Sequence, residues 1–147
     1  MLFIKELSYN KVLWISILAW FVAQCIKVIL TIILGKKLDL TRFVGSGGMP
    51  SSHSALVVSM STSIGMQEGF RSVVFALSVA VALIVMYDAA GVRRAAGKQA
   101  EVLNDILEEF QAHRDIPEEK LKELLGHTPV EVIAGAALGI LVSIILN

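Results

Sequence analysis

The sequence predicts an all-α fold: a polytopic membrane helix bundle of about four transmembrane spans with an amphipathic helical segment in one loop. Of its 147 residues, 55% are hydrophobic and 18% are charged, the mean hydropathy is +0.70, and the apolar residues lie in long runs. Average soluble domains carry about 25% charged residues. The low charge and the high apolar content of this chain therefore indicate helices in a lipid bilayer. A chain of this length forms a single domain, residues 1–147.

Four apolar stretches are the predicted spans. A full crossing needs about 20 apolar residues, so the second and fourth stretches are marginal in length. The second is rich in hydroxyl side chains, which we expect to face inward, where helices approach closely. The first carries Gln24 and Lys27 on one helix face, and we expect Lys27 to point inward rather than snorkel to the interface. The stretches are Val12–Leu34, Ser54–Met66, Val73–Ala90 and Val130–Leu146.

The polar segment between the third and fourth spans is predicted to form two helices. Gly91–His113 has an amphipathic pattern, and residues 114–124 form a shorter helix that begins near Pro117 and ends at Gly126. Cys25 is the only cysteine, which excludes a disulfide framework and a cysteine metal site. The net charge of zero argues against a nucleic-acid partner, and the first span is too long for a cleavable signal peptide.

Basic residues predict the orientation of the chain. With four spans, the loop at 35–53 and the segment at 91–128 lie on one side and hold nine basic residues, against three on the other side. The positive-inside rule therefore places both polar segments in the cytoplasm and both termini outside. The nine are Lys36, Lys37, Arg42, Arg93, Arg94, Lys98, Arg114, Lys120 and Lys122, and the three are Lys5, Lys11 and Arg71.

The most informative stretch runs from Gly47 to Ser54, between the first two spans. Its two glycines permit a tight turn, Pro50 suits the first helical position, and Ser51 and Ser52 can cap the helix that follows. Backbone N–H groups at a helix start bind anions, and His53 adds a group that titrates near neutral pH. This combination favours phosphate chemistry at the membrane.

Two other polar clusters are predicted to lie on the same side of the membrane. One runs from Tyr87 to Arg94 at the end of the third span, and the other from Gly126 to Glu131 at the start of the fourth. Phosphoryl transfer through histidine needs a nucleophilic imidazole, a carboxylate to fix its tautomer, a second imidazole for the leaving group, and cations for the equatorial oxygens. The three clusters contain a candidate for each role.

These motifs resemble a known family. The segments Gly-Gly-Met-Pro-Ser-Ser-His-Ser-Ala from Gly47, Asp-Ala-Ala-Gly-Val-Arg-Arg from Asp88, and Gly-His-Thr-Pro-Val-Glu-Val from Gly126 are similar to those of the divergent acid phosphatase/vanadium haloperoxidase-related proteins. That family of small bacterial and plant membrane proteins is distantly related to the type-2 phosphatidic acid phosphatases. The resemblance covers nearly the whole chain.

The resemblance implies a role for each matching residue. His127 would be the nucleophile, Glu131 would orient it, His53 would protonate the leaving group, and Arg93 or Arg94 would bind the phosphate. No metal or other cofactor is implied. The Lys-x6-Arg-Pro motif of the superfamily is absent. We therefore predict a catalytic set of His127, His53, Glu131 and Asp88, with phosphate-binding candidates Arg93, Arg94, Ser51, Ser52, Gly48, Lys27, Lys36 and Lys37.

Several of these residues have a structural alternative. Thr128 and Glu131 also match a capping box, which is compatible with catalysis if Glu131 serves both purposes. His53 could help cap a helix, and Asp88 could pair with a neighbouring arginine. Asp88 and Arg93 also begin the metal-binding pattern of the CDP-alcohol phosphotransferases, but Val102 and Ile106 stand where that pattern needs Gly and Asp.

The sequence therefore predicts a multi-pass cell-membrane phosphatase that acts on a lipid-linked or small phosphate ester through a phosphohistidine, with its site facing the cytoplasm. Its expected partner is a membrane lipid or polyprenyl phosphate, and a homodimer would close a pocket that so short a chain leaves open. The alternative is a catalytically inactive relative that binds lipid phosphates or acts in transport or assembly.

Overall fold

The described part of the chain is all-helical, which confirms the predicted fold class. The computed structural model describes residues 2–33, 48–111 and 126–147. Within these ranges there is no strand, and the helices run in the order α1 (Leu2–Ser8), α2 (Lys11–Ile33), α3 (Ser52–Glu68), α4 (Val73–Tyr87), the π-helical turn η2 (Asp88–Val92), α5 (Arg93–Gln111) and α6 (Pro129–Leu146).

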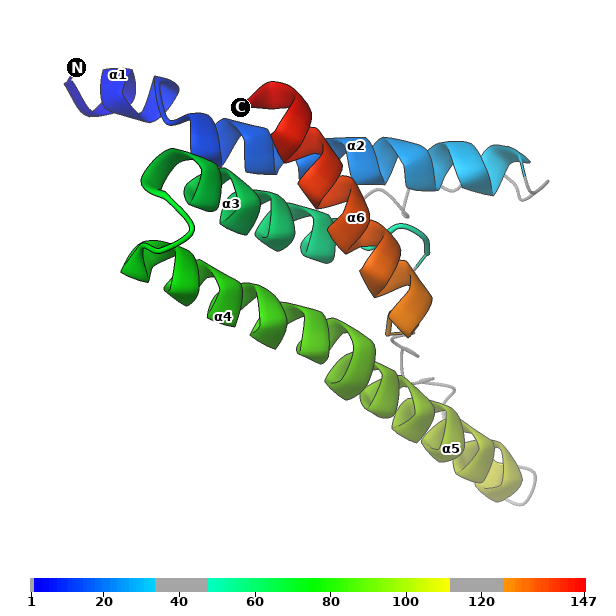
Figure 1. Cartoon of the computed structure of the whole chain (residues 1–147). Coiled ribbons are helices and arrows are strands. Elements are labelled where there is room, and N and C mark those ends of the chain that lie inside the picture. The colour runs from blue at the N-terminus through cyan, green and yellow to red at the C-terminus, as the bar shows by residue number, and fades with distance from the viewer. Residues whose placement is uncertain (1, 34–47, 112–125) are drawn as a thin grey trace.

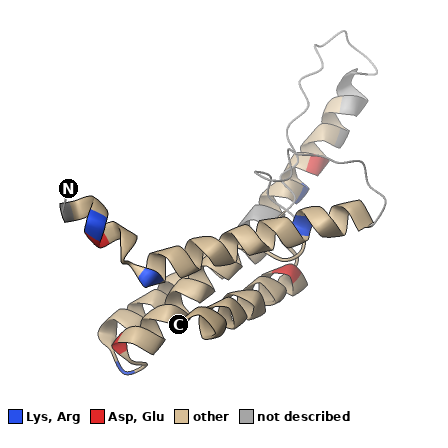
Figure 2. Cartoon of the chain, turned by 90° about the horizontal axis from the view of Figure 1, so that it is seen from above, with Lys and Arg blue, Asp and Glu red and all other residues tan. Residues whose placement is uncertain are grey.

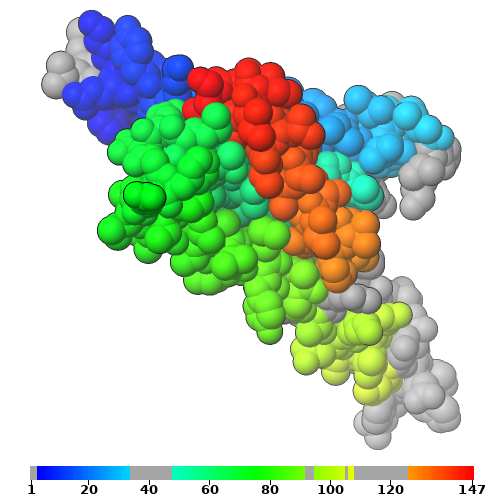
Figure 3. Space-filling view, viewed as in Figure 1, coloured from blue at the N-terminus to red at the C-terminus, as the bar shows by residue number. Residues whose placement is uncertain are grey.

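Helix α3 lies at the centre of the bundle. It packs against α2, α4 and α6, and α6 also contacts α2, whereas α4 packs mainly on α3 (Figure 1). In the space-filling view, α6 lies across the front of α3, and the C-terminal end of α6 reaches α2 (Figure 3). Helix α5 continues α4 and projects away from the bundle (Figure 1). Within the bundle, the helix that carries the most serines therefore has the most neighbours.

The long helices have the length and composition of membrane spans. Among the described residues, three helical stretches are long and apolar enough to cross, namely Lys11–Ile33, Val73–Asn104 and Pro129–Leu146. Helix α3 has 17 residues, about 26 Å at 1.5 Å per residue, and is less apolar. The count of four spans is therefore approximate. Charged residues lie mostly toward the two ends of the bundle (Figure 2).

Helices α3 and α6 approach each other very closely along one face of α6. A Cβ atom added to Gly135 would lie 2.2 Å from the carbonyl oxygen of Ser51, and one added to Gly139 would lie 2.5 Å from that of Ala55. Any side chain at these two positions would force the backbones apart. One turn further on, Ser143 is buried in the same contact. Small residues spaced four apart are a known basis for such packing in membranes.

The hydroxyl side chains of α3 face inward, as the sequence predicts. The hydroxyls of Ser59 and Ser143 lie 2.9 Å apart, and Ser143 also donates to the carbonyl oxygen of Ser59 at 3.0 Å. On the side of α3 that faces α4, the hydroxyls of Ser61 and Ser78 lie 2.8 Å apart. In a bilayer core these hydroxyls have no water to bond, so pairing across helices removes a cost of burial and fixes the register.

Some predicted boundaries are wrong by a few residues. Helix α3 begins at Ser52 with Ser51 as its N-cap, so Pro50 precedes the cap instead of occupying the first helical position. Ser51 satisfies a free backbone N–H of the first turn, which proline cannot do. The amphipathic helix is α5 (Arg93–Gln111), which begins at Arg93 instead of Gly91. Its predicted end at His113 lies outside the described residues. The predicted helix at 114–124 lies outside the described residues.

Two elements have no counterpart in the prediction. Helix α1 precedes the first span and is joined to α2 by the indole N–H of Trp14, which donates to the carbonyl oxygen of Leu7 at 3.1 Å. The turn η2 continues α4 directly into α5 with π-helical hydrogen bonding. Such turns are rare, and they are frequent at functional sites.

The close approach of α3 and α6 leads to a prediction for Gly139→Ala. The added methyl group would meet the backbone of α3, and overpacking of this kind costs about 1–3 kcal/mol. We expect a clear loss of thermal stability in detergent. Ala137→Leu, on the exposed face of the same helix, is the matched control and should leave the midpoint nearly unchanged. An unaltered midpoint for Gly139→Ala would contradict the tight contact.

Candidate active site

Three segments that are far apart in the sequence meet at one end of the bundle. They are the start of α3, the turn η2, and the residues before α6 (Figure 1). Two backbone hydrogen bonds join them: the N–H of Ser51 donates to the carbonyl oxygen of Glu131 at 2.9 Å, and the N–H of His127 donates to that of Ala89 at 3.0 Å. The convergence of these clusters, predicted from the four-span topology, is therefore present.

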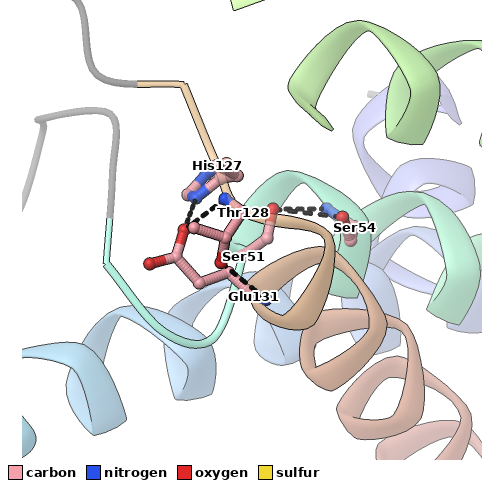
Figure 4. A network of polar contacts seen from close by, with 5 residues as sticks. All are labelled: Ser51, Ser54, His127, Thr128 and Glu131. Carbon is pink, nitrogen blue, oxygen red and sulfur yellow. Dashed lines mark hydrogen bonds and ion pairs between the residues drawn. The ribbon is translucent and has the colours of Figure 1, made fainter. Parts of the chain in front are cut away.

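Glu131 has two functions at the start of α6. Its Oε2 lies 3.1 Å from Nδ1 of His127 and accepts the backbone N–H of Thr128 at 3.0 Å (Figure 4). The hydroxyl of Thr128 in turn accepts the N–H of Glu131 at 3.3 Å, which completes a capping box. One carboxylate oxygen therefore makes both contacts, so the capping of α6 and the orientation of His127 are compatible.

The contact with Glu131 selects a tautomer for His127. A carboxylate accepts hydrogen bonds, so Nδ1 carries the proton and donates it, which leaves the in-plane lone pair on Nε2. His127 is 2% exposed, and its backbone N–H is held by the carbonyl oxygen of Ala89. A single tautomer with its lone pair on Nε2 is one requirement for a histidine that acts as a nucleophile or a general base.

His53 is the second residue of α3, and its side chain is exposed. Its ring centroid lies 6.4 Å from that of His127, with an angle of 59° between the ring planes. The two histidines come from segments more than seventy residues apart in the sequence. Their proximity depends on the packing of α3 against α6, because His53 is near the start of α3 and His127 immediately precedes α6.

The serines of the glycine-rich stretch contribute to the fold of the site. The Oγ atom of Ser51 accepts the N–H of Ser54 at 3.4 Å and its hydroxyl at 3.1 Å (Figure 4). Ser51 and Ser52 are both buried, whereas His53 is exposed. The Ser51 side chain is thus engaged in capping α3, and a contact of these serines with phosphate stays a prediction.

Lys27 approaches the same end of the bundle from α2. Its side chain is 3% exposed, which confirms its predicted inward orientation. Its Cγ would lie 3.3 Å from a Cβ added to Gly48, so the aliphatic part of the lysine packs beside the turn that leads into α3. The φ angle of Gly48 is +86°, a conformation that other residues rarely adopt. Among the basic side chains that the structure describes, Lys27 is thus the buried one that packs beside this turn.

The remaining predicted site residues are less completely defined. Asp88 is partly buried in η2, next to the residue that accepts the N–H of His127. Arg93 and Arg94 begin α5, where the structure describes the backbone alone, and Lys36 and Lys37 lie outside the described residues. Among the described side chains, no group of three His, Cys, Asp or Glu residues is placed to hold a metal ion.

The carbonyl oxygen of Ala89 is a site feature that the sequence analysis did not identify. In a π-helical turn the backbone hydrogen bonds are shifted by one residue, so a carbonyl becomes available to a partner outside the helix. The run of small residues from Ala89 to Gly91 is a weak sequence signal for this close backbone approach.

These features define a polytopic α-helical membrane protein with a carboxylate-oriented histidine beside a second histidine. Residues 8–142 match the model of the Divergent PAP2 family, and the chain belongs to that family. It is 43% identical over 152 residues to an uncharacterized membrane protein, YuiD of Bacillus subtilis (strain 168), with 96% of each chain covered. No solved structure matches the chain. The family resemblance predicted from the sequence motifs is therefore confirmed.

The capping box generates a prediction for Thr128→Ala. Loss of the Thr128 hydroxyl leaves a backbone N–H at the start of α6 without its partner, which costs about 0.5–2 kcal/mol. We expect a lower thermal midpoint in detergent. Thr128→Ser keeps the hydroxyl and should behave like the unaltered protein, whereas equal losses for both variants would contradict the capping role.

Proposed function

We propose that this protein is a membrane phosphatase that hydrolyses a lipid-linked or small phosphate ester through a phosphohistidine on His127, at a site facing the cytoplasm. The observation that carries the proposal is the contact of His127 Nδ1 with Glu131 Oε2 at 3.1 Å, with the ring of His53 at a centroid distance of 6.4 Å. Membership of the Divergent PAP2 family agrees with this chemistry.

In the first step, Nε2 of His127 attacks the phosphorus atom, and the bond between phosphorus and the ester oxygen breaks. Protonated His53 donates its proton to the departing oxygen, so the alcohol leaves neutral. Glu131 accepts a hydrogen bond from Nδ1–H and stabilises the positive charge that develops on the imidazole.

In the second step, water attacks the phosphorus atom and the bond between phosphorus and Nε2 breaks. His53, now neutral, takes a proton from that water, which restores its protonated form and releases inorganic phosphate. His53 thus acts as an acid in the first step and as a base in the second, as microscopic reversibility requires.

Cations and backbone N–H groups would stabilise the charge on the equatorial oxygens. The start of α3 supplies N–H groups beside His53, and a helix N-terminus favours anions. Lys27 packs against the turn before α3 and can supply a positive charge in place of the absent superfamily motif. Arg93 and Arg94 follow η2 and are further candidates, as are Lys36 and Lys37.

A lipid or polyprenyl phosphate suits this site because the histidines lie at the end of helices with the composition of membrane spans. The phosphate of such a molecule lies at the membrane surface, level with helix ends. A second copy of the chain could close the site from the side, and we include a homodimer in the proposal.

The proposed mechanism is tested by His127→Ala in a phosphate-release assay over a panel of lipid phosphates, with and without EDTA. Loss of positioned acid–base help typically lowers rates by about 10²–10⁴-fold, and loss of the nucleophile costs at least as much. We expect no detectable release by His127→Ala in a folded protein. Release by the unaltered protein should be unaffected by EDTA. The loss of rate in His53→Ala should be largest for esters with poor leaving groups.

Glu131→Gln separates the two functions of the carboxylate. The amide can still accept the N–H of Thr128, but it carries no charge to stabilise an imidazolium, so the rate should fall while the thermal midpoint changes little. Normal turnover by His127→Ala would refute the mechanism. If no ester is hydrolysed and lipid phosphates still bind, the binding-protein alternative replaces it.

The cytoplasmic orientation is tested by labelling single cysteines in intact cells, in a Cys25→Ala background. Lys98→Cys on α5 should react with a membrane-impermeant reagent after the membrane is opened, and Arg71→Cys, between α3 and α4, should react without opening. Both positions are exposed in the structure. The opposite pattern would place the histidines on the outer face.

A further inference from the structure

A groove of about 1040 Å³ lies along α3, on the side away from α6, and opens at the end of the bundle opposite the histidines. The elbow between α1 and α2 and the turn between α3 and α4 both lie at this end (Figure 1). No part of the proposed mechanism uses this groove. Its volume is several times that of the apolar hollow of about 230 Å³ between α3 and α4.

The walls of the groove are apolar along their length. Leu56, Met60 and Ile64 are spaced four residues apart on α3, so they form one stripe about 12 Å long. Leu13 and Ile17 of α2 line the groove from one side, and Val74 of α4 contributes at its end. These helices have the composition of membrane spans or pack among them, so the stripe lies at the depth of lipid acyl chains.

The open end of the groove is polar and carries both signs of charge. Lys5 and Lys11 line it together with Glu6 and Glu68, and Tyr9, Asn10 and Gln67 add hydrogen-bonding groups. Within the part of the chain that the structure describes, none of these four charged side chains takes part in an ion pair. An occupant with both a negative and a positive group would therefore find partners for each.

We propose that this groove holds one molecule of a zwitterionic phospholipid with a primary ammonium, a phosphatidylethanolamine, from the leaflet opposite the histidines. The phosphate meets Lys5 and Lys11, the ammonium meets Glu6 and Glu68, and one acyl chain lies along Leu56, Met60 and Ile64. The chemistry is complementary at both ends, since charge-assisted hydrogen bonds form at the head and methylene groups are buried along the tail.

A helix from a second copy of the chain would match the apolar walls. It would leave the four charges at the open end without partners, which is why the observations favour a phospholipid. The lipid site and the histidine site lie at opposite ends of the bundle, so each can be lost without loss of the other.

The test is to purify the full chain in mild detergent after exposure to vesicles of equal parts phosphatidylethanolamine, phosphatidylglycerol and phosphatidylcholine. Retained lipid is then identified and counted by native mass spectrometry. We expect about one phosphatidylethanolamine per chain. Met60→Trp fills the groove and displaces several methylene groups, so retention should fall on the order of a hundredfold. Leu77→Trp, on the exposed face of α4, is the matched control and should retain the lipid.

The head group is tested separately by the double variant Lys5→Gln and Lys11→Gln, which alters exposed side chains and keeps the fold. Retention should fall, whereas Arg71→Gln at the same end should have no effect. His127→Ala should retain the lipid fully, which distinguishes this site from the proposed phosphatase site. Equal retention of the three lipids, unchanged retention by Met60→Trp, or a disulfide between two copies through Met60→Cys would overturn the proposal.

Discussion

The contact between α3 and α6 is the constraint on which the rest of the structure depends. Gly135 and Gly139 allow the two backbones to approach so closely that no side chain fits between them. Lipid supplies no hydrophobic force to hold helices together, so packing and hydrogen bonds must do so. At the end of this contact, Ser51 donates to the backbone of Glu131, and His53 and His127 lie beside each other as a result.

Much of this arrangement can be predicted from the sequence, because its signals are local. A threonine followed by glutamate three residues later specifies a capping box, and serines within an apolar run specify an inward face. Other features depend on tertiary packing. Pro50 and Ser51 both suit a helix start, and only the docking of Ser51 against Glu131 decides between them. The π-helical turn and the groove along α3 correspond to no periodic pattern in the sequence, so they could not be predicted from it.

Glu131 shows how stability and chemistry share one group at this site. Its Oε2 atom both caps α6 and orients His127, so a helix that starts one residue later would also leave the imidazole without its partner. The backbone of His127 is held in turn by Ala89 from η2. The start of α6 thus orients the ring of His127, while the turn η2 holds its backbone.

The paired hydroxyls of α3 have a consequence for how the chain enters the membrane. Ser59 and Ser63 find their partner on α6, at Ser143, which the ribosome makes much later. Until then these two hydroxyls on α3 lack their partner, and α3 is less apolar than α2, α4 and α6. The hydrogen bonds on this face of α3 are therefore completed when α6 arrives, and the same late step brings the two histidines together.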